Sequence, residues 1–288
     1  MPNYPAINPS DLGEIHVSVP SNPEQQKIAD CLTSLDDLIR AEGERLEALK
    51  AHKRGLMQQL FPRPGETTPR LRFPEFHDAG PWEVKRLGEV YRFKPTNSWP
   101  RDRLNYESGT TRNIHYGDIH KGLCNSFRLS EETVPFLDDG LADRLASDAF
   151  CEPGDVILAD ASEDLADIGK AIEVVEINGE RLVSGLHTIL ASPIERRLIV
   201  GFAACLFASS AVRKQIQERA QGAKVLGLSK SQLSEVLLAY PRQESEQQKI
   251  ADCLTSLDDL IRAEGERLEA LKAHKRGLMQ QLFPQSAA

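Results

Sequence analysis

The chain contains one long stretch of sequence twice. Residues 24–62, EQQKIADCLTSLDDLIRAEGERLEALKAHKRGLMQQLFP, recur letter for letter at residues 246–284. About 180 unrelated residues separate the two copies, which is far more than the period of roughly 20–50 residues that is typical of solenoid repeats. The repeat therefore predicts one structural part that is used twice, with a different domain held between the two uses.

Each copy has the pattern of a long helix with one apolar seam. Asn22-Pro23 before the first copy and Ser245 before the second are helix start signals, and a Phe-Pro pair ends each copy. A helix of this length would extend about 55–58 Å. The apolar residues fall at coiled-coil spacing over five heptads. The predicted seam comprises Ile28, Leu32, Leu35, Ile39, Leu46, Leu49, Leu56 and Leu60 in the first copy, and Ile250, Leu254, Leu257, Ile261, Leu268, Leu271, Leu278 and Leu282 in the second.

Two charged residues interrupt the seam in each copy and suggest a register. The first helix leads into the middle of the chain and the second leaves it, so an antiparallel pair is expected. If Glu42 faces Lys275 and Lys53 faces Glu264, both buried charges are matched. A register displaced by one heptad would place them against leucines. The alternative is that Glu42 and Lys53 lie at the edge of the seam with their charged ends in water.

The composition predicts a protein of the cytoplasm. Of 288 residues, 40% are apolar and 27% are charged, and no apolar run is long enough to span a membrane. The N-terminus lacks a signal-peptide pattern, and the five cysteines have no metal-ligand spacing. The net charge of −8 argues weakly against nucleic-acid binding, although a local basic face can bind DNA on an acidic protein.

The middle of the chain, residues 81–241, mixes strand and helix signals. Residues 155–159 are a short apolar run, typical of a buried strand, and residues 171–177 alternate before Asn178-Gly179, a hairpin signal. Residues 198–220 have the pattern of a helix. We therefore expect an α+β protein, in which one mixed α/β domain is flanked by two long helices that form an antiparallel coiled coil.

A fainter repeat lies upstream of the two helices. Residues 7–20 match residues 228–241 at Ser, Leu, Glu and Pro positions, and each segment predicts a short capped turn followed by a strand. The first segment therefore resembles the tail of another domain. The predicted division is 1–21 as this tail, 22–62 as the first spacer helix, 63–80 as a linker, 81–241 as the middle domain and 242–288 as the second spacer helix.

This order of parts resembles the specificity subunit of type I restriction–modification systems, over nearly the whole chain. The linker 69–76 (PRLRFPEF), Trp82 and 87–90 (LGEV) look like that family's entry into a target recognition domain. Residues 246–250 (EQQKI), which follow a predicted strand and a proline, look like the start of its conserved spacer helix. The chain departs from the family in one respect: the family usually carries two recognition domains, whereas here there is one and a stub of about 20 residues.

The resemblance implies a subunit that reads a half-site in double-stranded DNA without catalysing a reaction. The helices would act as a ruler and as the docking surface for methyltransferase subunits, which carry S-adenosylmethionine, and a nuclease subunit would be a further partner. The chain itself would hold no cofactor and no metal. Two chains could associate through their spacer helices and read a palindrome split by a fixed spacer. Alternatively the chain is a truncated allele or a cloned fragment, with one reader per complex.

Reading DNA requires side chains that can hydrogen-bond base edges and phosphates. The resemblance does not transfer such residues, because they vary within the family, so the candidates come from polar loops. For each of them an ordinary solvated position is the alternative. The candidates are Arg101, Arg103, Arg112, His115, Tyr116, Ser162, Lys170, His187, Lys224, Ser229 and Lys230.

No catalytic motif is present. Residues 222–227 lack the Lys-Ser/Thr that ends a phosphate-binding loop, and without a Pro-Pro dipeptide the loop of amino-methyltransferases is absent. The acidic residues at 160–167 indicate a surface loop rather than a metal cluster. Glu83-Val84-Lys85 has the local form of a nuclease motif, but Asp78 lies only five residues ahead of it, which indicates coincidence. Two other functions remain open: a coiled-coil scaffold whose middle domain binds protein, and a stand-alone nuclease.

Overall fold

The computed structural model describes residues 8–13, 17–138 and 140–283, and the chain divides into two compact units. Residues up to Lys50 and from Asp259 onward form the first unit, and Ala51–Asp258 form the second. Two long helices, α2 (Asn22–Leu60) and α8 (Glu244–Leu282), contribute to both units. No helix in the described ranges is long and apolar enough to cross a membrane.

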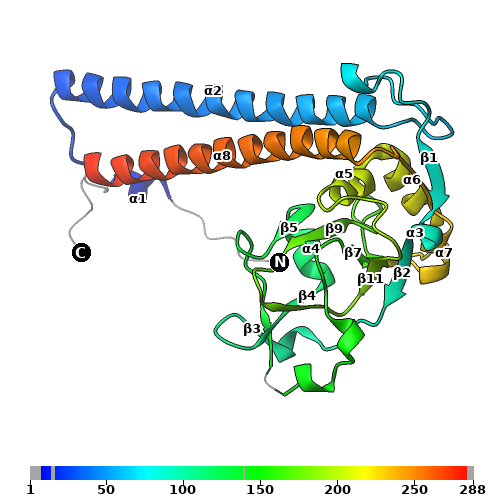
Figure 1. The fold of residues 1–288 in the computed structure, drawn as a ribbon. Helices are drawn as coiled ribbons and strands as arrows, with labels where there is room; N and C mark the ends of the chain where they lie inside the picture. The colour runs from blue at the N-terminus through cyan, green and yellow to red at the C-terminus, as the bar shows by residue number, and fades with distance from the viewer. Residues whose placement is uncertain (1–7, 14–16, 139, 284–288) are drawn as a thin grey trace. The chain divides into compact units, whose positions relative to one another are not determined.

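In the first unit, the stretches of α2 and α8 run side by side in opposite directions (Figure 1). Ion pairs between the two helices confirm this direction, because residue numbers rise along one helix as they fall along the other. Leu46 and Leu268 are buried between them. Every apolar residue of the predicted seam is buried or half-buried, so the heptad stripe is the face that each helix turns away from water.

The charged seam residue Glu42 does not form its predicted pair. Its carboxylate accepts from Arg267 at 2.9 Å, whereas Lys275 pairs with Asp36. The predicted register is therefore wrong. The observed pairs fit the register displaced by one heptad, in which Glu42 lies opposite Leu268. Apolar packing sets this register, and arginines that flank the seam reach in to the carboxylates.

The second predicted pair is replaced in the same way. Glu264 accepts from Arg45 at 3.0 Å in the first unit, and Lys53 pairs with Asp258 in the second. These contacts are the counterparts of the pairs made by Glu42 and Lys275, because the sequence repeats. The repeat thus gives two equivalent sets of contacts along the two helices, each with one Glu–Arg pair and one Lys–Asp pair.

Among the residues that the structure describes, the second unit has two larger sheets and two small ones. The five-stranded sheet has the order β2-β11-β7-β9-β5, and only β5 and β9 pair in parallel. The four-stranded sheet has the order β10-β4-β6-β3. The strands are β1 (Glu83–Arg86), β2 (Tyr91–Lys94), β3 (Leu104–Asn105), β4 (Thr111–Ile114), β5 (Ser126–Arg128), β6 (Phe136–Leu137), β7 (Val156–Ala159), β8 (Ala161–Ser162), β9 (Ala171–Glu176), β10 (Arg181–Ser184), β11 (Thr188–Pro193), β12 (Leu226–Gly227) and β13 (Leu237–Tyr240).

Short helices join these strands. Besides α1 (Pro9–Gly13) in the first unit, the chain has α3 (Leu87–Val90), α4 (Tyr116–Lys121), α5 (Phe202–Ala208), α6 (Ser210–Arg219) and α7 (Lys230–Ser234). Single 3-10 turns are η1 (Pro74–Phe76), η2 (Arg101–Arg103), η3 (Ala142–Arg144) and η4 (Ser147–Ala149). The predicted helix over 198–220 is divided, because Ser209 adopts an extended conformation between α5 and α6.

The strand predicted at 155–159 is β7, which is buried along its whole length. The predicted hairpin at Asn178-Gly179 is wrong. The chain does turn there, and both residues have positive φ, but β9 pairs with β7 and β5 whereas β10 pairs with β4 in the other sheet. A turn signal is local, and the choice of partner strand is made by the packing of the whole unit.

The upstream repeat is only partly reproduced. Residues 1–7 and 14–16 lie outside the described residues. α1 aligns with α7, as the sequence match predicts, but residues 17–20 form no strand, whereas their counterpart β13 pairs with β1. A strand needs a partner to satisfy its backbone groups, and β13 has one.

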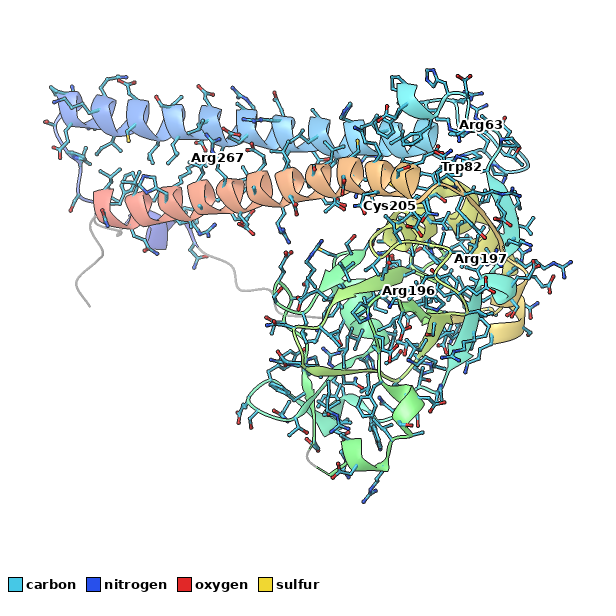
Figure 2. The ribbon with its side chains drawn as sticks, viewed as in Figure 1. Arg63, Trp82, Arg196, Arg197, Cys205 and Arg267 are labelled. Carbon is cyan, nitrogen blue, oxygen red and sulfur yellow. The ribbon has the colours of Figure 1, made fainter. Side chains whose placement is uncertain are left out.

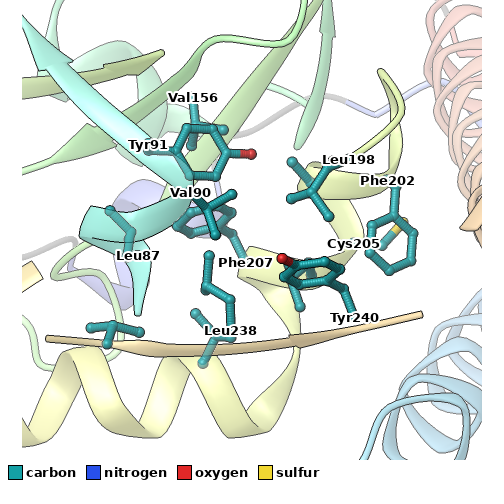
Figure 3. Packing of buried hydrophobic residues seen from close by; sticks show 14 of the residues in the cluster. Leu87, Val90, Tyr91, Val156, Leu198, Phe202, Cys205, Phe207, Leu238 and Tyr240 are labelled. Atoms are coloured by element: carbon teal, nitrogen blue, oxygen red, sulfur yellow. The ribbon is translucent and has the colours of Figure 1, made fainter. Parts of the chain in front are cut away.

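The main core of the second unit packs aromatic side chains against one face of β13, the strand that carries Leu238 and Tyr240 (Figure 3). Tyr91, Phe202, Phe207 and Tyr240 are fully buried there. The end of α2 and the start of α8 belong to the same cluster, which holds the two helix ends to the domain. A second cluster, which includes Ile114, lies against the five-stranded sheet.

The start of α8 is bound into the domain by charge as well as by apolar packing. Glu246 is 1% exposed, and it accepts from Arg72 at 2.7 Å through each oxygen and from the indole of Trp82 at 3.1 Å (Trp82 is labelled in Figure 2). Ile250, one turn further along, is also buried. Glu24, the counterpart of Glu246 in the first copy, is exposed, so identical sequences have opposite surroundings.

Candidate nucleic-acid interface

A capping box fixes the start of α4. The His115 ring accepts from the backbone N–H of Gly117 at 3.1 Å, and Asp118 accepts from the backbone N–H of His115 at 3.0 Å. Arg101, from η2, donates to the other oxygen of Asp118 at 2.7 Å and to the Tyr106 hydroxyl at 3.0 Å. Burial, together with the Arg101 charge, lowers the pKa of His115. The ring is therefore neutral near pH 7 and suited to accept the Gly117 bond.

The Tyr116 ring is the centre of an aromatic cluster. Its centroid lies 4.5 Å from that of His115, and it meets the rings of His120 and His187 edge to face at 5.5 and 5.3 Å. The backbone N–H of Tyr116 donates to the carbonyl of Leu186 at 3.2 Å. This bond ties α4 to the loop between β10 and β11.

His187 occupies that loop with a left-handed backbone, at φ 55°. Its Nδ1 lies 3.3 Å from a carboxylate oxygen of Asp160, at the end of β7, and its carbonyl accepts from the Asp160 N–H at 3.0 Å. The His187 side chain is half exposed. Burial raises the pKa of Asp160, whereas the neighbouring His187 imidazole lowers it by a smaller amount.

The loop after α6 joins the same surface. The Leu228 N–H donates to the Asp160 carbonyl at 2.9 Å, and Ser229 caps α7 through a reciprocal pair of bonds with Gln232. Lys230 is exposed, and its ammonium group lies 3.4 Å from the Lys94 carbonyl. We call the connected area the loop surface; it comprises Arg101, Tyr106 and residues 115–121, 160–162, 185–188 and 228–230.

Seven of the eleven candidate residues lie on the loop surface, but two of them are not free to bind DNA. His115 is buried as the cap of α4. Ser162 is also buried, and its hydroxyl accepts from the Asp164 N–H at 3.0 Å. The accessible members are Arg101, Tyr116, His187, Ser229 and Lys230.

The other four candidates lie elsewhere. Arg112 is committed to the protein, since it donates to Glu180 and to the Val134 carbonyl and stacks 3.5 Å from the Phe136 ring centroid. Lys170 pairs with Asp167 at 2.7 Å. Arg103 and Lys224 are exposed. These contacts hold the Arg112 guanidinium against the domain, and its role in DNA binding stays a prediction.

Sequence reasoning missed two acidic residues that organise the loop surface. Asp118 follows His115 by three residues, which is the spacing of a capping box and could have indicated it. Asp160 was grouped with an acidic surface loop, but it is half-buried and holds His187. Within the described ranges, no three His, Cys, Asp or Glu side chains are placed to share a metal ion.

The chain belongs to the family described as the type I restriction modification DNA specificity domain, whose model matches residues 3–51 and 80–273. The matched residues include most of both long helices and the whole loop surface.

Two curated relatives come from Methanocaldococcus jannaschii. The MjaIX type I restriction enzyme specificity subunit is 29% identical over 125 residues, 42% of this chain and 29% of that protein. The putative MjaX specificity subunit is 23% identical over 98% of this chain and 61% of its own length. The chain therefore spans less than two thirds of each relative. Their names agree with the prediction of a non-catalytic specificity subunit.

Solved structures share the fold. The S subunit of a type I restriction–modification system from M. genitalium matches with a TM-score of 0.59 at 17% identity, covering 98% of this chain and 66% of that one. The HsdS subunit from Thermoanaerobacter tengcongensis matches with a TM-score of 0.54 at 16% identity, over 97% and 63%. The mixed α+β class is thereby confirmed.

Proposed function

We propose that this chain is a DNA sequence-recognition subunit of a type I restriction–modification complex, and that its loop surface reads one half-site in double-stranded DNA. The observation that carries the proposal is the convergence of five distant loops on one ordered surface, in a chain that belongs to the DNA specificity family. Arg101, Tyr116, His187, Ser229 and Lys230 supply donors and acceptors of the kind that read base edges and phosphates.

In this proposal, α2 and α8 act as an antiparallel coiled coil that sets a distance and docks methyltransferase subunits. Those subunits carry S-adenosylmethionine and methylate adenine, and a nuclease subunit joins them. This chain holds no cofactor and catalyses no step. Pairing of two chains through the helices would present two identical readers, and their target would be a palindrome split by a fixed spacer.

The rival function is a scaffold whose middle domain binds protein. Leu38 and Leu260, which are counterparts in the two copies, are 41% and 39% exposed, and apolar side chains on a helix surface suit a protein partner.

Selection from a random duplex pool, with the chain in complex with its methyltransferase subunits, separates the two functions. Enrichment of a defined motif is expected for the reader. No enrichment, even at low salt where non-specific contacts are strongest, would favour the scaffold.

A further inference from the structure

Two non-glycine residues in the described ranges have a positive φ, and only one of them is easily explained. Asn178, at φ 49°, precedes Gly179 in the turn after β9, and Asn-Gly is the common sequence for such turns. His187, at φ 55°, has no such local reason. Strained backbone of this kind gathers at functional sites, where the surrounding structure holds it.

The loop that carries His187 is held from several sides. The Gly185 N–H donates to the Ile114 carbonyl at 2.8 Å, and a Cβ at Gly185 would lie 2.5 Å from the Asn113 amide nitrogen. The Thr188 hydroxyl closes the turn by bonding the Gly185 carbonyl at 2.5 Å. Close packing therefore fixes the backbone on both sides of His187.

The imidazole is also held by two neighbouring side chains. Asp160 lies 3.3 Å from Nδ1, and Tyr116 packs its ring against the imidazole edge to face. Nε2 has no hydrogen-bond partner in the described part of the chain, and the side chain is 51% exposed. When a carboxylate accepts from Nδ1–H, a neutral ring presents Nε2 as an acceptor.

An unpaired acceptor on a held, half-exposed ring matches one feature of the DNA major groove. Adenine N6 and cytosine N4 present amino donors there, whereas guanine and thymine present carbonyl acceptors at the corresponding place. We infer that His187 is a specificity-determining residue that accepts a hydrogen bond from the amino group of one adenine or cytosine in the half-site. Asp160 is its positioning residue. This inference rests on the proposed function of DNA recognition.

The test uses the complete complex of the chain with its methyltransferase subunits. Relative affinities are measured for duplexes that carry each single-base change in the selected motif. His187→Gly removes the ring but keeps a residue that adopts positive φ freely, so folding is preserved. Its expected effect is loss of discrimination at one motif position, from at least about fivefold to none.

Asn178→Gly is the matched control, because it makes the same backbone change at the other non-glycine residue with positive φ. It is expected to leave the base preference at every motif position unchanged. His187→Asn, which also tolerates this backbone, is a second variant, and it weakens discrimination at the same position. Asp160→Asn, which no longer fixes the tautomer, is expected to weaken that same position while the rest of the motif is retained.

Three outcomes would overturn the inference. His187→Gly could leave the base preferences intact, or it could weaken all duplexes equally, which is the behaviour of a phosphate contact. Asp160→Asn could alter a different motif position from His187→Gly. If the wild-type complex selects no motif at all, the proposed function itself fails, and the inference fails with it.

Discussion

At the scale of single residues, the exact repeat provides pairs of identical side chains in different surroundings. Glu246 is enclosed by Arg72 and Trp82, whereas Glu24 is exposed. The repeat itself could not distinguish them, because the 38 residues that follow each of them are the same. The difference comes from side chains more than 160 positions away along the chain.

Glu246→Ala is therefore expected to destabilise the protein, and Glu24→Ala is not. Removal of the Glu246 carboxylate leaves the Arg72 guanidinium, 8% exposed, buried without its partner, at a cost of about 3–5 kcal/mol. The change at Glu24 should stay within about 0.5 kcal/mol. Urea unfolding of the two variants measures both values, and equal losses would contradict the assigned contacts.

Glu173 predicts a dependence of stability on pH. Burial raises its pKa from 4.5 to about 7, although its carboxylate also accepts from the N–H groups of Gly201 and Ala204. Because the pKa of Glu173 is higher in the folded state than in the unfolded state, its contribution to the free energy of unfolding is complete below pH 4.5. This contribution is lost as the pH rises through 7. The loss amounts to about 3 kcal/mol.

Unfolding measured from pH 4.5 to pH 8 tests this expectation, with Glu173→Gln as the control. The glutamine variant cannot titrate, so the portion of the pH dependence that belongs to Glu173 should vanish. A wild-type curve with the same slope as the variant would show that this carboxyl group does not titrate in the range.

At the scale of elements, periodic patterns predict which segments form helices and strands, but they do not predict which segments pair with each other. The helices α2 and α8 and the buried strand β7 follow from apolar spacing, which is a local property. The partner of β10 and the break at Ser209 depend on contacts between distant segments. The register of the helix pair was mispredicted for the same reason, since matching charges ignored the flanking Arg45 and Arg267.

The register can be tested with a double-mutant cycle on Lys275. The structure pairs Lys275 with Asp36, and both side chains are partly exposed, so a coupling of about 0.5 kcal/mol is expected between these two positions. No coupling is expected between Lys275 and Glu42, whose carboxylate binds Arg267. A measured coupling between Lys275 and Glu42 would contradict the observed register and support the predicted one, in which these charges face each other.

At the scale of the whole molecule, the order of parts along the sequence is enough to indicate the family. The candidate site was only partly predictable. Polar loop residues could be identified, but the loops that meet, and the side chains already committed to the protein, such as Arg112, depend on the folded domain. Asp160 and Asp118 illustrate this, because both act by holding another residue.

Sequencing of methylated adenines, in cells that carry the chain together with its methyltransferase subunits, tests the central claim most directly. The account predicts methylation confined to one defined motif, with two identical half-sites at a fixed spacing if two chains act together. Methylation that follows no motif, or a motif unchanged when this chain is replaced by another specificity subunit, would contradict it.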